Sequence, residues 1–235
     1  MIPWLESPTA FPDTRRARRE PNGLLCAGGD LEPATIVAAY SRGIFPWFSD
    51  DQPILWWSPD PRMVLFPAEF KVSKSLARTV RAGKFDVRFD HAFAGVIAGC
   101  AAPREPGGGT WIVPEMQEAY LRLHRMGVAH SVESWVCGEQ GEELVGGLYG
   151  IALGRMFFGE SMFSRATDAS KVALVALVDK LRRDGFELID CQQETRHLAS
   201  FGARPIARSD FVHRLQGLIN LPDHTSHWRA EHVEA

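Results

Sequence analysis

A chain of 235 residues with 45% hydrophobic and 23% charged residues has the composition of a globular protein and enough length for one large or two smaller domains. Its formal net charge of −3 provides no overall attraction to nucleic acid, so any RNA binding has to come from a local basic patch. Its four cysteines are scattered without a C-x-x-C pair, which argues against a zinc site and a disulfide framework and favours a reducing cytoplasm.

The first part of the chain predicts a small N-terminal domain. Residues 1–6 lack the basic and apolar regions of a signal peptide, and no apolar run approaches the length of a membrane span. A short strand and a helix that starts at Pro33 are expected within this part. Because the Pro-rich segment 58–61 predicts a hinge, we divide the chain into residues 1–62 and residues 63–235.

Tryptophans are dense before this hinge. Trp47, Trp56 and Trp57 lie within eleven residues of one another. Trp47, which lies between Pro46 and Ser49, is a candidate platform for stacking a base or another flat ligand. Trp56 and Trp57 are better explained as core residues of the small domain.

A basic helix follows the hinge. The segment that starts near Ser73 predicts a helix in which Lys74, Arg78 and Arg81 recur at i, i+4 and i+7 and form one basic stripe. No acidic residue lies between residues 71 and 84 to neutralise it. This basic stripe is the candidate for contact with nucleic-acid phosphates, and the alternative is an ordinary solvated helix face.

The middle of the chain predicts alternating strands and helices. The loop over residues 101–110 contains three consecutive glycines but no Walker or dinucleotide-binding motif, and it leads to Trp111. The elements expected here are strands over 85–89 and 130–137 and helices over 91–99 and 114–125.

The most regular stretch runs from residue 144 to residue 192. Strands are expected over 144–153 and 156–163, and the Gly154-Arg155 turn between them suits a type II′ hairpin. A helix and a last strand over 186–192 follow, so that an antiparallel meander precedes a β-α-β unit, which is typical of the α+β class. The helix carries an apolar stripe formed by Leu174, Leu177, Val178 and Leu181.

Side-chain parity places polar groups in apolar surroundings. In the last strand Asp190 and Gln192 point the same way, roughly 6.6 Å apart along the strand. In the hairpin Glu160 is expected to share a face with Phe158 and Met162. Because a charge is costly to bury unless it is paired, Glu160 and Asp190 are candidates for a polar site in an apolar setting. The alternative is that both are strand-end residues with ordinary hydrogen-bond partners.

Several long and rare motifs run through the chain: Glu20-Pro-Asn-Gly-Leu-Leu, Gly28-Gly-Asp-Leu, Gly43-Ile-Phe-Pro-Trp-Phe-Ser, Trp56-Trp-Ser-Pro-Asp-Pro-Arg, Gly159-Glu-Ser-Met-Phe-Ser-Arg, Ala169-Ser-Lys and Asp190-Cys-Gln. Together they resemble the leucyl/phenylalanyl-tRNA–protein transferases over about residues 21–221. The resemblance implies a small N-terminal domain joined to a GNAT-like acyltransferase domain, an α+β fold with a mixed, mainly antiparallel sheet. It also implies a cytoplasmic monomer that needs no cofactor.

The same resemblance implies that the protein moves Leu or Phe from aminoacyl-tRNA to the N-terminal Arg or Lys of acceptor proteins, which marks them for N-degron degradation. Asp190, Gln192 and Glu160 would serve the reaction centre and the acceptor N-terminus. Trp47 and Trp111 would hold the terminal adenosine of the tRNA. The basic stripe matches, by position and charge, a cluster used for the acceptor stem.

The transferred side chain is expected in an apolar pocket. Relatives can have Phe where Leu177 and Leu181 stand here, so the preference between Leu, Phe and Met stays open. A pocket of this kind discriminates by only about 1–3 kcal/mol per methylene. Its expected lining is Leu148, Met162, Leu174, Leu177 and Leu181.

The implied chemistry is aminolysis of an ester, which runs downhill without ATP or a metal. Asp190 would orient the amine or accept its proton, and Glu160 would pair with the basic N-terminus or support Asp190; the division of roles stays open. We expect Asp190→Asn to keep the fold and slow transfer. Two alternatives are a GNAT-type enzyme that uses acyl-CoA and an RNA-binding module without catalysis. A His-x-x-His spacing at residues 224–227 has no further ligand near it, so no metal site is expected.

Overall fold

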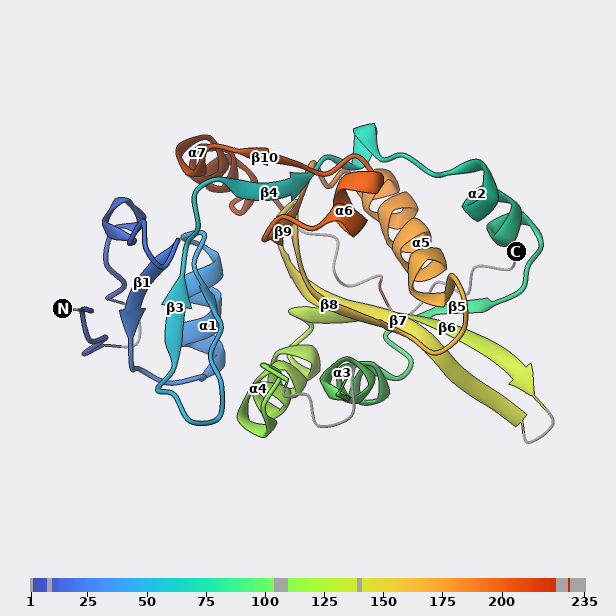
Figure 1. Cartoon of the computed structure of the whole chain (residues 1–235), viewed down its shortest axis with the longest axis horizontal. Helices are drawn as coiled ribbons and strands as arrows, with labels where there is room; N and C mark the ends of the chain where they lie inside the picture. The colour runs from blue at the N-terminus through green and yellow to red at the C-terminus, as the bar shows by residue number, and fades with distance from the viewer. Residues whose placement is uncertain (1, 8–9, 104–109, 139–140, 223–227, 229–235) are drawn as a thin grey trace.

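The computed structural model describes residues 2–7, 10–103, 110–138, 141–222 and 228. The three glycines of the 101–110 loop and the His-x-x-His segment lie outside these residues. The chain forms a small sheet near the N-terminus and a large sheet with helices on both faces (Figure 1). None of the described helices is long and apolar enough to cross a membrane.

The small sheet has three antiparallel strands in the order β1-β3-β2. The strand and helix expected in this part are present, but β2 and β3 were not predicted, because strands of two and three residues are too short to show an alternating pattern. Trp56 is fully buried and its Nε1 donates to the carbonyl of Gly28 at 2.9 Å, which confirms its core role. The elements are the 3-10 helix Thr14–Arg16, β1 (Leu24–Ala27), α1 (Pro33–Tyr40), β2 (Phe45–Pro46) and β3 (Leu55–Trp57).

The large sheet has seven strands in the order β10-β4-β9-β8-β7-β6-β5. All neighbours are antiparallel except β8 and β9, which are parallel and joined through α5. The predicted α+β class, with a small N-terminal unit and a mixed, mainly antiparallel sheet, is confirmed. The strands are β4 (Arg62–Leu65), β5 (Asp86–Phe89), β6 (Ala129–Gly138), β7 (Gly141–Leu153), β8 (Met156–Ser164), β9 (Leu188–Gln192) and β10 (Arg204–Ile206).

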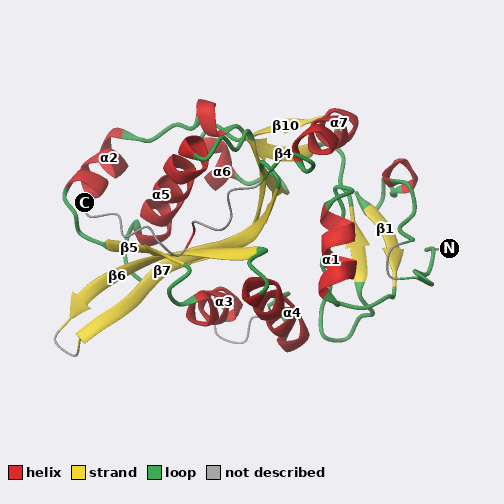
Figure 2. Cartoon of the chain, turned by 180° about the vertical axis from the view of Figure 1, so that it is seen from behind, coloured by secondary structure: helices red, strands yellow, loops and turns green. Residues whose placement is uncertain are grey.

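Helices cover both faces of the large sheet. Figure 1 shows α5 above the sheet and α3 and α4 below it, with α1 of the small unit facing α4; the reverse view in Figure 2 agrees. The helices are α2 (Lys74–Arg81), α3 (Phe93–Ala101), α4 (Pro114–Arg125), α5 (Ala169–Arg183), α6 (Arg196–Ser200) and α7 (Arg208–Leu218), with a 3-10 turn at Pro67–Glu69.

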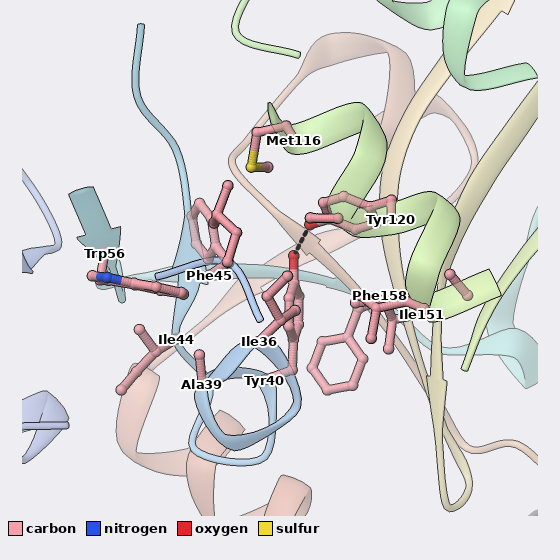
Figure 3. Close-up of a cluster of buried hydrophobic side chains, with 14 of the residues drawn as sticks. Ile36, Ala39, Tyr40, Ile44, Phe45, Trp56, Met116, Tyr120, Ile151 and Phe158 are labelled. Carbon is pink, nitrogen blue, oxygen red and sulfur yellow. Dashed lines mark hydrogen bonds between the residues drawn. The ribbon is translucent and has the colours of Figure 1, made fainter. Parts of the chain in front are cut away.

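Two hydrophobic cores result, one on each face. The first core joins the small sheet and α1 to α3, α4 and one face of the large sheet, and part of it is drawn in Figure 3. The second core lies between α5 and the opposite face. Because the first core contains Ile36 and Trp56 as well as Ile151 and Phe158, the small sheet packs as part of one body with the large domain.

Glu160 occupies a β-bulge. On the β7–β8 ladder Gly150 pairs with Gly159 and Tyr149 pairs with Ser161, so Glu160 is the extra residue. A bulge reverses the side-chain alternation beyond it. Phe158 therefore belongs to the first core, whereas Met162 packs against the second. Tyr40 contacts both Phe158 and Glu160, so these two residues share a face as expected, whereas the expectation that Met162 shares it is wrong for this reason.

Strands β8 and β9 separate beside this bulge. Their parallel pairing ends at Phe158 and Asp190, although β8 continues to Ser164 and β9 to Gln192. Glu160 and Gln192 each lie two residues beyond the last pair. The parting of the two strands thus places both polar side chains at one point of the sheet.

Candidate active site

The side chains of Glu160 and two tyrosines form a closed set of three short oxygen–oxygen contacts. The hydroxyls of Tyr40 and Tyr120 lie 2.6 Å apart (Figure 3). Tyr40 donates to Oε1 of Glu160 at 2.7 Å, and Tyr120 donates to Oε2 at 2.8 Å. Both tyrosines are fully buried, while Glu160 keeps partial exposure. These residues come from α1, α4 and β8, so the cluster forms only when the two units of the chain meet.

Packing sets the positions of the tyrosines. Tyr40 is the last residue of α1, and its ring meets the edge of Phe158 with 5.1 Å between centroids. Tyr120 lies in the middle of α4 and contacts Tyr149 at 5.4 Å. Burial raises the pKa of both Tyr40 and Tyr120 well above its usual range, which keeps the two hydroxyls protonated as donors.

The pKa of Glu160 is raised. Burial raises it from 4.5 to about 7, against the hydrogen bonds from Tyr40 and Tyr120, which lower it. The nearby charge of Asp190 adds to the rise, and that of Arg62 opposes it. A partly exposed carboxyl that titrates near neutral pH is suited to proton transfer.

Asp190 is held by an arginine that sequence reasoning missed. Arg62 Nε donates to Oδ1 of Asp190 at 2.8 Å and Nη2 donates to Oδ2 at 2.7 Å, with both side chains fully buried. Arg62 also donates to the carbonyl of Gly43 and lies between the rings of Phe45 and Phe211, 4.8 and 4.6 Å from their centroids. The sequence contains one sign of this arginine's role, because Arg62 starts the apolar run Arg62–Leu65. A charge buried in such a strand needs a partner of opposite charge.

Gln192 connects Asp190 to Glu160. Its backbone has a φ of 55°, and its N–H donates to Oδ1 of Asp190 at 3.0 Å. Its side-chain Nε2 donates to Oε1 of Glu160 at 3.5 Å. The structure thus brings the three predicted polar residues together, and it adds Tyr40, Tyr120 and Arg62, which were not predicted.

The five expected pocket residues also come together. Leu148, Leu174, Leu177 and Leu181 are buried in the second core, and Met162 packs against it with partial exposure. They lie on the α5 side of the sheet, whereas Arg62 and Tyr40 reach the site from the first-core side. Met162 follows Glu160 by two residues along the separated part of β8.

The expected RNA-contacting residues lie apart from one another. Trp47 is 38% exposed and meets the edge of Trp57 at 5.4 Å, so Trp57 supports an exposed aromatic surface. Trp111 is half-buried against the first core. The residues of the basic stripe are exposed on α2, at the β5 end of the sheet in Figure 1, with no ion pair to any described residue. No group of three or more His, Cys, Asp or Glu residues suited to a metal ion occurs within the described ranges.

Comparisons with known proteins agree over most of the chain. The family model for leucyl/phenylalanyl-tRNA protein transferase matches residues 64–216, and the model for the N-terminal domain of the same family matches residues 29–60. A leucyl/phenylalanyl-tRNA–protein transferase of Aromatoleum aromaticum is 61% identical over 98% of this chain and 96% of its own.

A second relative with the same name, from an Azoarcus species, is 62% identical over 92% of this chain and 90% of its own. Among solved structures, FemX is similar with a TM-score of 0.49 and 8% identity, over 78% of this chain and 71% of that chain. From the family models and the relatives we conclude that the chain belongs to the leucyl/phenylalanyl-tRNA–protein transferase family and is an aminoacyltransferase.

Proposed function

We propose that this aminoacyltransferase moves Leu or Phe from aminoacyl-tRNA to the N-terminal Arg or Lys of acceptor proteins, which marks them for N-degron degradation. The observation that carries the proposal is the partly exposed Glu160, with a pKa of about 7, at the point where β8 and β9 separate. A basic acceptor and a proton-transfer step both need such a group. The four free cysteines support a cytoplasmic location, and we expect a monomer.

The reaction forms one bond and breaks one. The neutral α-amine of the acceptor attacks the ester carbonyl carbon, and the carbon–oxygen bond to the tRNA breaks. The amine loses a proton, and the departing ribose oxygen gains one. With a reference pKa of about 7.7–8.0, part of the α-amine is already neutral near pH 7, so the enzyme mainly positions the reactants and handles the proton.

Asp190 supports this chemistry as an orienting charge. Both of its oxygens accept hydrogen bonds from Arg62, and Oδ1 also accepts the N–H of Gln192. Because Asp190 is fully buried, an attacking amine does not reach its carboxylate. Its effect on the reaction therefore passes through Gln192, whose side-chain amide it holds near Glu160.

Glu160 then has the proton-transfer role. It is partly exposed, it is not part of an ion pair among the described residues, and its pKa of about 7 lets it accept and return a proton near neutral pH. Tyr40 and Tyr120 are positioning residues, because they hold the carboxyl and do not reach the surface themselves.

The remaining assignments form part of the same proposal. Trp47 and Trp111 hold the terminal adenosine, and the exposed ring of Trp47 beside Trp57 supports stacking. The basic stripe contacts tRNA phosphates, which its exposure and lack of described ion pairs support. The apolar side-chain pocket lies beside Met162 and is formed by the predicted five residues. We also propose the domain division into residues 1–62 and 63–235.

A transfer assay tests the proposal. Purified protein is mixed with Leu-tRNA, acetyl-CoA and a peptide that begins with Arg, and the acyl group on the peptide is identified by mass spectrometry. We expect leucine on this peptide and none on a matched peptide that begins with Ala. Glu160→Gln should lower kcat by about 10²-fold, while Glu187→Gln, at an exposed carboxylate, should not. An acetylated peptide, or equal transfer to both peptides, would overturn the proposal.

A further inference from the structure

Three close oxygen–oxygen contacts join Glu160, Tyr40 and Tyr120, and each hydrogen bond needs one proton. The contacts measure 2.6, 2.7 and 2.8 Å. If Glu160 is a carboxylate, the two tyrosines supply two protons, and donating both to Glu160 leaves the 2.6 Å contact between the tyrosines without one. Two hydroxyl oxygens at that distance without a proton repel each other. A neutral carboxyl supplies the third proton, and all three contacts then become hydrogen bonds around a closed ring.

The charges around this ring are balanced without Glu160. Asp190 is the nearest other carboxylate, and Arg62 neutralises it in the buried ion pair. Tyr149, from β7, adds a third buried hydroxyl that carries no charge. A neutral Glu160 therefore leaves the resting site without net negative charge. The titratable and charged groups that face Glu160 are Tyr40 from α1, Tyr120 from α4, Tyr149 from β7, Arg62 from β4 and Asp190 from β9.

We propose that the resting enzyme holds Glu160 as a neutral acid and that the cationic side chain of the acceptor's N-terminal Arg or Lys binds by displacing its proton to solvent. The inference rests on the proposed function, because it assumes a basic acceptor. The step balances: the carboxylic acid and a free cation become a carboxylate paired with the cation, and one proton leaves. Tyr40 and Tyr120 then both donate to the carboxylate, and their mutual contact lengthens.

Proton linkage has consequences for specificity. A neutral acceptor cannot balance the charge left by the departing proton, so the site discriminates against it even if its shape fits. The pKa of about 7 for Glu160 means that nine-tenths of the enzyme carries the proton at about pH 6 and one-tenth at about pH 8. Acceptor binding should therefore weaken about tenfold from pH 8 to pH 6, in addition to any titration of the peptide itself.

Calorimetry measures the displaced proton directly. A peptide that begins with Arg is titrated into the full-length protein in phosphate and in Tris, and the difference in observed heat gives the number of protons released. Relative to Glu160→Gln, which cancels the peptide's own titration, the wild-type protein should release about 0.9 proton at pH 6 and about 0.1 at pH 8. A matched peptide that begins with citrulline should release none, and Glu187→Gln should behave as wild type.

Infrared difference spectroscopy gives a second measurement that does not depend on binding heats. On addition of the Arg peptide at pH 6, the carbonyl band of a protonated carboxyl should disappear, and Glu160→Gln should not show this loss. Equal proton release by wild type and Glu160→Gln, with no loss of the band, would overturn this inference alone. If the Arg peptide binds at no pH and receives no amino acid, the proposed function itself fails.

Discussion

The buried ion pair between Arg62 and Asp190 predicts that Asp190→Asn unfolds more readily than the wild type. Asparagine keeps the shape of aspartate and one oxygen, but its amide group would direct N–H donors at the donors of Arg62. Two charge-assisted hydrogen bonds, at 2.8 and 2.7 Å, are disturbed, and the guanidinium stays buried without a counter-charge.

Removing one partner of such a pair costs about 3–5 kcal/mol. Proteins of this kind have a total free energy of unfolding of about 5–15 kcal/mol, so the loss is a large share of the whole. For a chain of this length it corresponds to a decrease in Tm of about 6–20 °C. From sequence alone we expect Asp190→Asn to keep the fold. With the ion pair in view, we expect the variant to be clearly less stable than the wild type.

Urea unfolding followed by circular dichroism checks this value. Asp179→Asn is the matched control, because Asp179 forms a longer, exposed pair with Arg182 at 3.5 Å and should change stability by less than about 1 kcal/mol. The double variant Arg62→Met with Asp190→Leu replaces both charges by apolar groups and should regain much of the stability while transfer stays low. If Asp190→Asn matches the wild-type midpoint and transfer still falls about 10²-fold, Asp190 acts in the chemistry and the ion pair does not carry the predicted share of stability.

Three further predictions follow from the described contacts. Replacing Lys74, Arg78 and Arg81 together by Glu should leave Tm unchanged. The slope of log K for tRNA binding against log salt concentration should become shallower by about 2–3 units, and an unchanged slope would exclude the basic stripe from phosphate contact. Leu177→Trp should reduce transfer of Phe more than of a smaller residue and, because Leu177 is 1% exposed, destabilise the fold by about 1–3 kcal/mol, with Leu177→Met as control. Burial raises the pKa of Glu133 from 4.5 to about 7, so its contribution to stability is full below pH 4.5 and is lost as the pH rises to 7. Glu133→Gln should therefore lose less unfolding free energy between pH 5 and pH 8 than wild type; parallel curves would contradict this.

Patterns local in sequence predicted most of the fold. The apolar stripe of α5 and the alternation along the 144–192 stretch are properties of consecutive residues, so they can be recognised without the structure. The bulge at Glu160 could not be, because the extra residue is defined only by its pairing with β7. One unpredicted residue moved Met162 to the other face of the sheet.

The candidate site was predictable only in part. Asp190, Gln192 and Glu160 stand out as polar groups within apolar strands. Their partners do not, because Arg62 lies 128 residues from Asp190 and Tyr40 lies 120 residues from Glu160 in the chain. A buried tyrosine looks like any other core aromatic until its hydroxyl has an assigned neighbour.

The way the ring is assembled limits how this protein can recombine with its relatives. Tyr40 comes from the small unit, Tyr120 and Glu160 come from the large one, and the first core is continuous between the two units. A hybrid joined at residues 58–61 would pair α1 of one parent with α4 of another, and any mismatch there would displace the carboxyl. The Arg62–Asp190 pair extends the same constraint to β9. Segments exchanged between homologues should therefore carry residues 40–192 from a single parent.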